Sequence, residues 1–328
     1  MPKTMTRALR VALALTMLAV PFAGCGDDDP APSAARTEAS ATAGAFPVTL
    51  EHAYGTTTIP SEPERVVTIG FNEDDFVLAL GVKPVGVRDF IGTFDEDERV
   101  WARDLLGGET PEKIGGEELD LEKIAALRPD LIMGVYSYID EPTYEKLSQI
   151  APTVAPTKPD AADRWQDQTL ITGRALGREE QATKLVERVE ERFAQVREEH
   201  PEFEGKTLAY ALGFEQGGNT YSLEQTDLRT QLFTALGFEL PKKTGPISRE
   251  RLDLIDVDVL VTAGATEEQL LDMPVVAGLD VVKEGRVVHL GDFDSEANGA
   301  IGYSSPLSLP RALEIVVPKL AEAVQAGS

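Results

Sequence analysis

One segment of this chain occurs twice, and the repeat limits the folds that the chain can adopt. The stretch Asp120–Met133 aligns without a gap on the stretch Ser248–Val261, so that Glu122 falls on Glu250. Each copy predicts a capped turn of helix, a break and a short buried strand. Two copies of such a unit indicate two similar lobes, each of which presents an exposed acid at the same place.

The N-terminal segment predicts export from the cytoplasm. Three basic residues precede an apolar run, Val11–Val20, that is too short to span a bilayer. The run leads to the sequence from Phe22 to Cys25, which resembles the lipobox of bacterial lipoproteins, with Phe22 where leucine is more usual. That resemblance implies cleavage before Cys25, the only cysteine in the chain, and attachment of lipid to it. The alternative is an ordinary signal peptide followed by an incidental cysteine.

Composition and periodicity divide the chain into segments. The stretch after Cys25 is rich in Ala, Asp, Ser, Thr and Pro, which is typical of a flexible tether. The predicted organisation is a signal peptide (1–24), a tether (25–45), an N-terminal α/β lobe (46–160), an inter-lobe helix (161–200) and a C-terminal α/β lobe (201–328).

Short strands and helices alternate in both halves of the chain. Arg65–Ile69 and Asp130–Val135 are predicted strands of the first half, and Thr207–Ala211 and Val257–Thr262 are predicted strands of the second. Helical patterns with short connections stand between successive strands, and this is the pattern of a parallel α/β sheet. Each lobe is therefore expected to have a central parallel sheet.

A long amphipathic pattern separates the two halves. Between Asp163 and Glu199 apolar residues recur at helical spacing, interrupted only by Gly173 and Gly177. One continuous helix of this length would run for about 50 Å, enough to cross two lobes. The pattern predicts one rigid helix between the lobes and therefore a stiff clamp.

Charge and motifs exclude several classes of function. The formal net charge is −25, and loss of the signal segment with its three cations lowers it to about −28, which argues against nucleic acid as a partner. The sequence contains no P-loop, no Gly-x-Ser-x-Gly elbow and no His-Glu-x-x-His motif. The three histidines, His52, His200 and His289, lie far apart, so no metal site and no catalytic residue is predicted.

An ordered set of short runs resembles the iron-siderophore and cobalamin class of ABC-transporter substrate-binding proteins, over residues 47–325. The runs are Arg65–Gly70, Leu78–Val87, Leu121–Ile132, Ile247–Leu252, Val281–Val287 and Ser305–Pro310. The resemblance implies two Rossmann-like lobes of the class III type, joined by one rigid helix, with the ligand between them. It also implies that Glu122 and Glu250 pair with arginines of a permease.

Candidate ligand-binding residues follow the predicted strands, because ligands of open α/β sheets bind at the carboxyl ends of strands. Aromatic rings would pack on an apolar chelate, and Arg and Tyr groups would donate hydrogen bonds to its oxygens. The candidates are Phe71, Asn72, Arg88, Trp101, Tyr136, Tyr138, Phe214, Tyr221 and Tyr303. Hydroxamate binders of this class often carry an Arg six residues before the docking Glu. Gly116 stands there instead, which argues against a hydroxamate-type pocket unless Arg88 substitutes.

The sequence therefore predicts a monomeric lipoprotein anchored through Cys25 on the extracytoplasmic face of the cell membrane. It would bind a ferric siderophore without a cofactor of its own and deliver it to an ABC permease dimer with its ATPase. Haem or cobalamin is an alternative ligand of the same fold, and Tyr136 or Tyr221 would suit haem. Two alternatives come from other classes: an extracytoplasmic hydrolase or metal-dependent enzyme, and a surface lipoprotein that signals or adheres.

Overall fold

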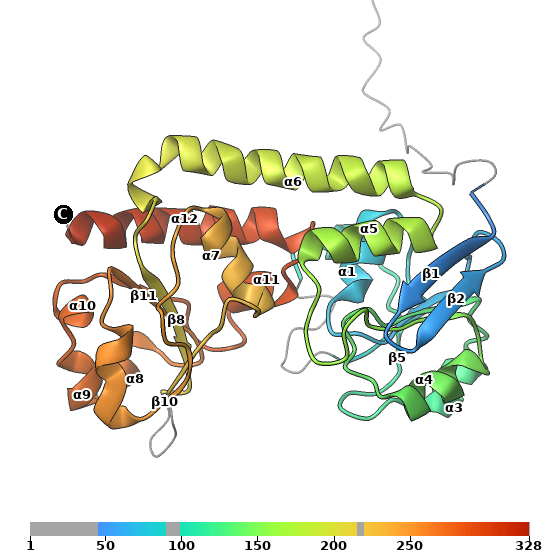
Figure 1. The fold of residues 1–328 in the computed structure, drawn as a ribbon, viewed down its shortest axis with the longest axis horizontal. Coiled ribbons are helices and arrows are strands. Elements are labelled where there is room, and N and C mark those ends of the chain that lie inside the picture. Colours follow the sequence, from blue (N-terminus) through green and yellow to red (C-terminus); the bar gives the residue numbers. More distant parts are fainter. Residues whose placement is uncertain (1–44, 90–98, 215–219, 328) are drawn as a thin grey trace, which may run out of the picture. The chain divides into compact units, whose positions relative to one another are not determined.

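The computed structural model describes residues 45–89, 99–214 and 220–327. The predicted signal peptide, almost all of the predicted tether and Cys25 lie outside these residues. The described residues all belong to one compact unit, Glu38–Ser328. Within that unit two α/β lobes follow one another along the chain (Figure 1).

The first lobe contains a hairpin and a five-stranded parallel sheet of order β5-β4-β3-β6-β7. Its elements are β1 (Val48–His52), β2 (Gly55–Ile59), β3 (Val66–Thr68), α1 (Glu73–Ala79), β4 (Gly86–Val87), α2 (Arg103–Leu106), β5 (Glu112–Lys113), α3 (Leu121–Ala126), β6 (Leu131–Met133), α4 (Glu141–Ser148) and β7 (Thr153–Val154). Two helices, α5 (Trp165–Ala175) and α6 (Glu179–Glu199), lead to the second lobe.

The second lobe contains a five-stranded sheet of order β10-β9-β8-β11-β12. Its elements are η1 (Pro201–Phe203), β8 (Leu208–Leu212), β9 (Thr220–Ser222), η2 (Leu228–Thr230), α7 (Gln231–Ala235), β10 (Gly245–Ile247), η3 (Arg249–Ile255), β11 (Val259–Thr262), α8 (Glu267–Leu271), α9 (Pro274–Ala277), α10 (Asp280–Lys283), β12 (Val287–His289), α11 (Glu296–Tyr303) and α12 (Ser308–Ala326).

The prediction of two parallel sheets is confirmed for the first lobe and holds for three of the five strands in the second. Strands β8, β11 and β12 are parallel, but β9 runs antiparallel to both β8 and β10. The seven residues between β8 and β9 are too few for the crossover that a parallel pair requires. The chain therefore turns back, and the sheet is mixed.

The repeated segment forms similar but unequal structures in the two lobes. In the first copy the Asp120 side chain accepts a hydrogen bond from the Lys123 N–H (3.0 Å) and caps α3. In the second copy η3 is a 3-10 helix, Ser248 makes no side-chain cap, and the backbone of Arg251 is not helical. Only the first copy is thus the capped α-helix that the pattern predicts.

The repeat keeps one structural role in both copies. Asp130 accepts hydrogen bonds from the backbone N–H groups of Glu64 and Arg65, each at 2.9 Å. Its counterpart Asp258 accepts one from the N–H of Thr207 at 2.8 Å. In each lobe, therefore, this acid ties the start of the first sheet strand to the start of its neighbour.

The segment 163–199 is not the one continuous helix that the pattern predicts, because the chain forms two helices that pack side by side (Figure 1). Gly177 adopts a left-handed conformation (φ 66°) after the last turn of α5. The N–H of Arg178 then donates to the Gly173 carbonyl (2.7 Å), and that of Gly177 donates to the Arg174 carbonyl (3.1 Å). This hydrogen-bond pair is the Schellman motif, which ends a helix and reverses the chain.

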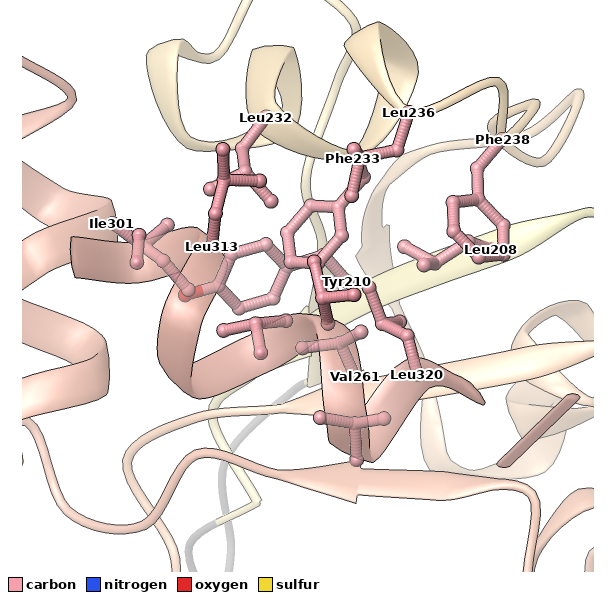
Figure 2. Packing of buried hydrophobic residues seen from close by; sticks show 14 of the residues in the cluster. Leu208, Tyr210, Leu232, Phe233, Leu236, Phe238, Val261, Ile301, Leu313 and Leu320 are labelled. Carbon is pink, nitrogen blue, oxygen red and sulfur yellow. The ribbon is translucent and has the colours of Figure 1, made fainter. Parts of the chain in front are cut away.

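Helix α6 alone connects the lobes and contributes to the cores of both. At 21 residues it is about 30 Å long. Ala182 and Leu185 join the core of the first lobe, whereas Val189, Phe193 and Val196 join the core of the second. The second core continues between the sheet and α12, where Tyr210, Phe233 and Leu313 pack together (Figure 2).

Gly173 is where α5 and α6 approach most tightly, and we predict that Gly173→Ala destabilises the protein. A Cβ at Gly173 would overlap the Cβ of Ala182 on α6. Overpacking of this kind costs about 1–3 kcal/mol, against a gain in helix propensity of about 1 kcal/mol. Urea unfolding should show a net loss of up to about 2 kcal/mol.

Gly116→Ala serves as the matched control, because the nearest atom to an added Cβ there is 3.9 Å away. Its free energy of unfolding should stay within about 0.5 kcal/mol of the wild-type value. A Gly173→Ala variant as stable as the wild type would show that the two helices separate easily.

Candidate functional site

A cavity of about 600 Å³ lies between the lobes and is lined by residues of both. Its lining is rich in aromatic rings and contains one acid and one arginine. The lining residues are Phe71, Tyr136, Tyr138, Tyr210, Asp227, Leu228, Arg229, Phe293, Asn298, Gly299 and Gly302. Cavities of this size and composition are typical of small-molecule sites.

The wall from the first lobe is built by the loops after β3 and β6. These strands are neighbours at the centre of the sheet, and the chain leaves them in opposite directions, so their loops form the crevice of an open α/β sheet. The N–H of Phe71 donates to the carbonyl of Tyr136 (3.0 Å), which joins the two loops. Phe71, Tyr136 and Tyr138 then form an aromatic cluster, with ring centroids 5.2–6.2 Å apart.

Tyr138 is the member of this cluster that a ligand reaches most easily. Its side chain is 50% exposed, and its backbone is left-handed, with φ 51°. A bulky residue in this conformation is strained, and such residues concentrate at functional sites. Tyr136 is more deeply placed, and burial raises the pKa of its hydroxyl, which therefore remains a neutral hydrogen-bond donor.

The wall from the second lobe carries the charged groups. Asp227 and Arg229 form a two-bond pair, with Arg229 Nε donating to Oδ1 (2.9 Å) and Nη2 donating to Oδ2 (2.7 Å). Burial alone would lower the pKa of Arg229, but the hydrogen bond and the charge of Asp227 raise it overall. Arg229 therefore stays protonated, and its charge is matched by that of Asp227.

Asn298 positions the remaining part of this wall. Its Nδ2 donates to the carbonyls of Gly291 (3.0 Å) and Asp292 (2.7 Å), which holds the loop that carries Phe293. The Phe293 ring is 54% exposed and lies against Gly264, where a Cβ would overlap it. The loop thus presents an aromatic ring to the cavity from a fixed backbone.

A buried polar network beside the cavity joins the lobes. Asp75 of α1 receives hydrogen bonds from Arg99 Nη1 (2.7 Å), Trp101 Nε1 (2.8 Å) and Ser305 Oγ (2.6 Å). Ser305 precedes α12, so this carboxylate connects the first lobe to the last helix of the second. Burial raises the pKa of Asp75, and the charge of Arg99 opposes that shift.

Glu73 is a second buried acid, directly behind the aromatic wall. Its Oε1 accepts a hydrogen bond from the N–H of Tyr136, while Oε2 has no hydrogen-bond partner among the described residues. The carboxylate occupies the space that a Cβ at Gly70 would fill. Burial raises the pKa of Glu73 to about 7, with the Tyr136 hydrogen bond and Arg88 opposing the shift.

Three of the nine candidate ligand residues line the cavity, namely Phe71, Tyr136 and Tyr138. Three others belong to the junction between the lobes. Asn72 is fully buried and donates to the backbone carbonyl of Tyr303 (2.9 Å), and the Tyr303 ring packs against Trp101. These side chains contribute to contacts between the lobes, and none of them is among the residues that line the cavity.

The other three candidates lie apart from the lining. Arg88 donates to the carbonyls of Gly116, Ile69, Ser137 and Glu117 and stacks over Phe71, 4.2 Å from the ring centroid. Phe214 is buried in the core of the second lobe, and Tyr221 is an exposed residue of β9. Sequence position after a strand cannot distinguish these roles, because core, hinge and cavity residues all occur there.

Sequence reasoning missed three second-lobe residues of the lining, Asp227, Arg229 and Tyr210. Asp227 stands at the start of η2, where it accepts a hydrogen bond from the N–H of Arg229 (3.0 Å). The Asp-x-Arg spacing was the available signal, because it places both charged side chains in one turn.

A smaller cavity of about 390 Å³ lies at the amino ends of β8 and β11. Two of its charged side chains bind the backbone: Arg286 donates to the carbonyl of Asp258 (2.8 Å), and Asp256 accepts from the N–H groups of Asp280 and Val281. This cavity lies at the opposite sheet edge from the cleft, and it is a less suitable ligand site.

The candidate docking acids, Glu122 and Glu250, are both exposed, in α3 and η3. The described ranges contain no cluster of three or more His, Cys, Asp or Glu side chains placed to hold a metal ion. None of the helices in the described part of the chain has the length and hydropathy needed to cross a bilayer.

Comparison with known proteins places this geometry in a family. The profile of the family described as periplasmic binding protein matches residues 66–292. The solved structure of a periplasmic solute binding protein from Mycobacterium smegmatis is 35% identical, with a TM-score of 0.78 over 84% of this chain and 98% of that one. PiaA of Streptococcus pneumoniae, solved in complex with ferrichrome, is 27% identical, with a TM-score of 0.75 over 86% and 100% of the two chains.

Curated relatives are more distant or match over shorter stretches. The Fe(3+)-citrate-binding protein YfmC of Bacillus subtilis is 26% identical over 244 residues, which are 71% of this chain and 75% of YfmC. The chain spans 46% and 61% of the length of two other relatives from the same bacterium.

The raised pKa of Glu73 predicts how stability depends on pH. Because the folded pKa of about 7 exceeds the ordinary value of 4.5, the folded state binds this proton more tightly. The stabilisation by protonated Glu73 is present at low pH and is lost as the pH rises through about 7. As the pH rises from about 4.5 to above 7, ionisation of Glu73 should therefore lower the free energy of unfolding by roughly 3 kcal/mol in total.

Glu73→Gln should reduce the fall in unfolding free energy between about pH 5 and pH 8 by about 1–3 kcal/mol, measured by urea titration at each pH. Glu141→Gln, which changes an exposed acid in the first turn of α4, should keep the wild-type dependence. An unaltered pH dependence in Glu73→Gln would contradict the assignment.

Proposed function

This chain belongs to the periplasmic binding protein family, and we propose that it captures a ferric siderophore in the cavity between its lobes for delivery to an ABC permease. The single observation that carries this proposal is the aromatic-lined cavity at the carboxyl edge of the first sheet. Relatives support it, since one is a Fe(3+)-citrate-binding protein and another was solved with ferrichrome.

The chemistry of the cavity fits a large chelate better than a reacting substrate. Aromatic walls on both lobes would pack on the organic periphery of the complex, while Arg229 and the tyrosine hydroxyls would donate to its oxygens. The described lining contains no serine, cysteine or histidine. We therefore propose a binding protein without catalytic activity, in which iron is cargo held by its chelator.

Cellular placement is part of the proposal. We propose that Cys25 carries a lipid anchor on the extracytoplasmic face of the membrane and that the protein acts as a monomer. Glu122 and Glu250 would then meet the permease, one from each lobe. Exposed acids at a contact rim add little affinity, but they fix the orientation of the partners.

Tyr138→Ala tests the binding site. Loss of an exposed ring that stacks on the ligand should weaken binding of a ferric siderophore about tenfold or more, since burial of such a ring contributes about 1–2 kcal/mol. Titration calorimetry with a panel of hydroxamate, catecholate and citrate complexes measures this loss. Tyr221→Ala changes a comparably exposed tyrosine outside the lining and should leave affinity unchanged. Absence of binding by the wild type across the whole panel would refute the proposed function.

Glu122→Ala combined with Glu250→Ala tests docking. Uptake of a radiolabelled ferric complex by the native host should fall at least about tenfold, while affinity in solution stays at the wild-type level, because neither acid touches the cavity. The matched control is Glu141→Ala with Glu268→Ala, which removes exposed first-turn acids from the same two lobes. Equal uptake losses in both double variants would argue against a specific docking role.

A further inference from the structure

The cavity holds an ion pair rather than a free cation, and this bears on the charge of its ligand. The Asp227 carboxylate accepts two hydrogen bonds from the side chain of Arg229, through Nε and Nη2. These are the only charged side chains in the described lining. The positive charge of Arg229 is therefore neutralised by Asp227 before any ligand binds. The Nη1 atom of Arg229 takes no part in the pair and can donate to a neutral oxygen of a ligand.

Arg88 lies close to the lining but is not part of it. Its guanidinium lies behind the Phe71 ring with donors directed to four backbone carbonyls. Burial lowers the pKa of Arg88, and the charge of the Glu73 carboxylate opposes this shift. The hydroxyls of Tyr136 and Tyr210 have raised pKa values because of burial, so they contribute neutral donors.

The two segments within the lobes that lie outside the described residues contain no basic side chain. Segments 90–98 and 215–219 contain five acids and neither lysine nor arginine. The chain as a whole carries a formal charge of −25. An anionic ligand would thus lose its hydration on entering a cavity whose described lining offers no unmatched positive charge in return.

We propose that the cavity selects ferric complexes without net negative charge and discriminates against citrate and catecholate complexes. A ferric tris-hydroxamate is the representative class, and Arg229 would take the part that neither position 116 nor Arg88 can play in this chain. The inference rests on the proposed function and concerns the same site. Apolar aromatic walls suit an uncharged complex, and Arg229 Nη1 with the tyrosine hydroxyls suits its carbonyl-type oxygens. The Asp227 carboxylate, which neutralises Arg229, is the residue that sets the selectivity.

A charge series of ligands tests the proposal on the wild-type protein. Ferrichrome is the uncharged probe, ferric dicitrate is an anionic probe, and ferric enterobactin is a more highly charged anion. Titration calorimetry should give ferrichrome a Kd at least about tenfold lower than either anion. Its affinity should change less than about twofold between low and high salt, because no net charge is transferred.

Asp227→Asn tests the residue. Asparagine keeps an oxygen that can accept from the Arg229 N–H, so η2 retains its cap while the carboxylate charge is lost. Affinity for the two anions should rise about tenfold, and this gain should shrink at high salt. The ratio of the ferrichrome affinity to the anion affinity should therefore fall about tenfold. Asp253→Asn is the matched control, because Asp253 pairs with Arg251 at the same two-residue spacing on an exposed surface.

The outcomes separate the two proposals. If either anion binds the wild type more tightly than ferrichrome, the charge selectivity is refuted and the proposed function stands. If folded Asp227→Asn shows no gain for the anions, Asp227 does not set the selectivity and the inference fails. If none of the three complexes binds the wild type, both the proposed function and the inference are refuted.

Discussion

The shared burial of helix α6 is the constraint on which the rest of the structure depends. The first half of its apolar face lies in the core of one lobe and the second half in the core of the other. Each large apolar side chain that is buried contributes about 1.5–3 kcal/mol, so separation of the lobes would expose apolar surface in two cores at once. The cleft is consequently held between bodies whose spacing is fixed by packing, and we expect ligand binding to involve only a small closure.

Polar contacts between the lobes further restrict how the two lobes are oriented. Asp75 accepts three hydrogen bonds, one of them from Ser305 at the start of α12, and Asn72 donates to the backbone of Tyr303. Buried groups of this kind are costly unless they are satisfied, so only a narrow set of lobe orientations is compatible with them. The loops after β3 and β6 are thereby placed opposite the wall of the second lobe, and the aromatic cluster meets the Asp227–Arg229 pair across one cavity.

Much of the fold could be predicted from the sequence because it depends on local patterns. Buried strands such as Val66–Thr68 and Val259–Thr262 have apolar runs, and the repeat correctly indicated two related lobes. The prediction failed where a pattern continues through a turn. Apolar residues keep their helical spacing from α5 into α6. The pattern therefore does not show that the chain reverses at Gly177. The candidate site was harder to predict, because residues with different roles occupy similar positions after a strand. Asn72 contacts the other lobe, Arg88 binds the backbone of nearby loops, and Phe71 lines the cavity.

The sequence by itself determined the two lobes, the segment between them, the exposed acids Glu122 and Glu250, and the family resemblance. These follow from periodicity, capping and the order of short runs, which are properties of neighbouring residues. Only the tertiary structure decided that α5 folds back on α6, that the second sheet is mixed, and that Asp227 neutralises Arg229 beside the tyrosines. The physical reason is that a cavity and its charge balance arise from side chains far apart in the chain, whose distances are set by how two cores pack on one helix.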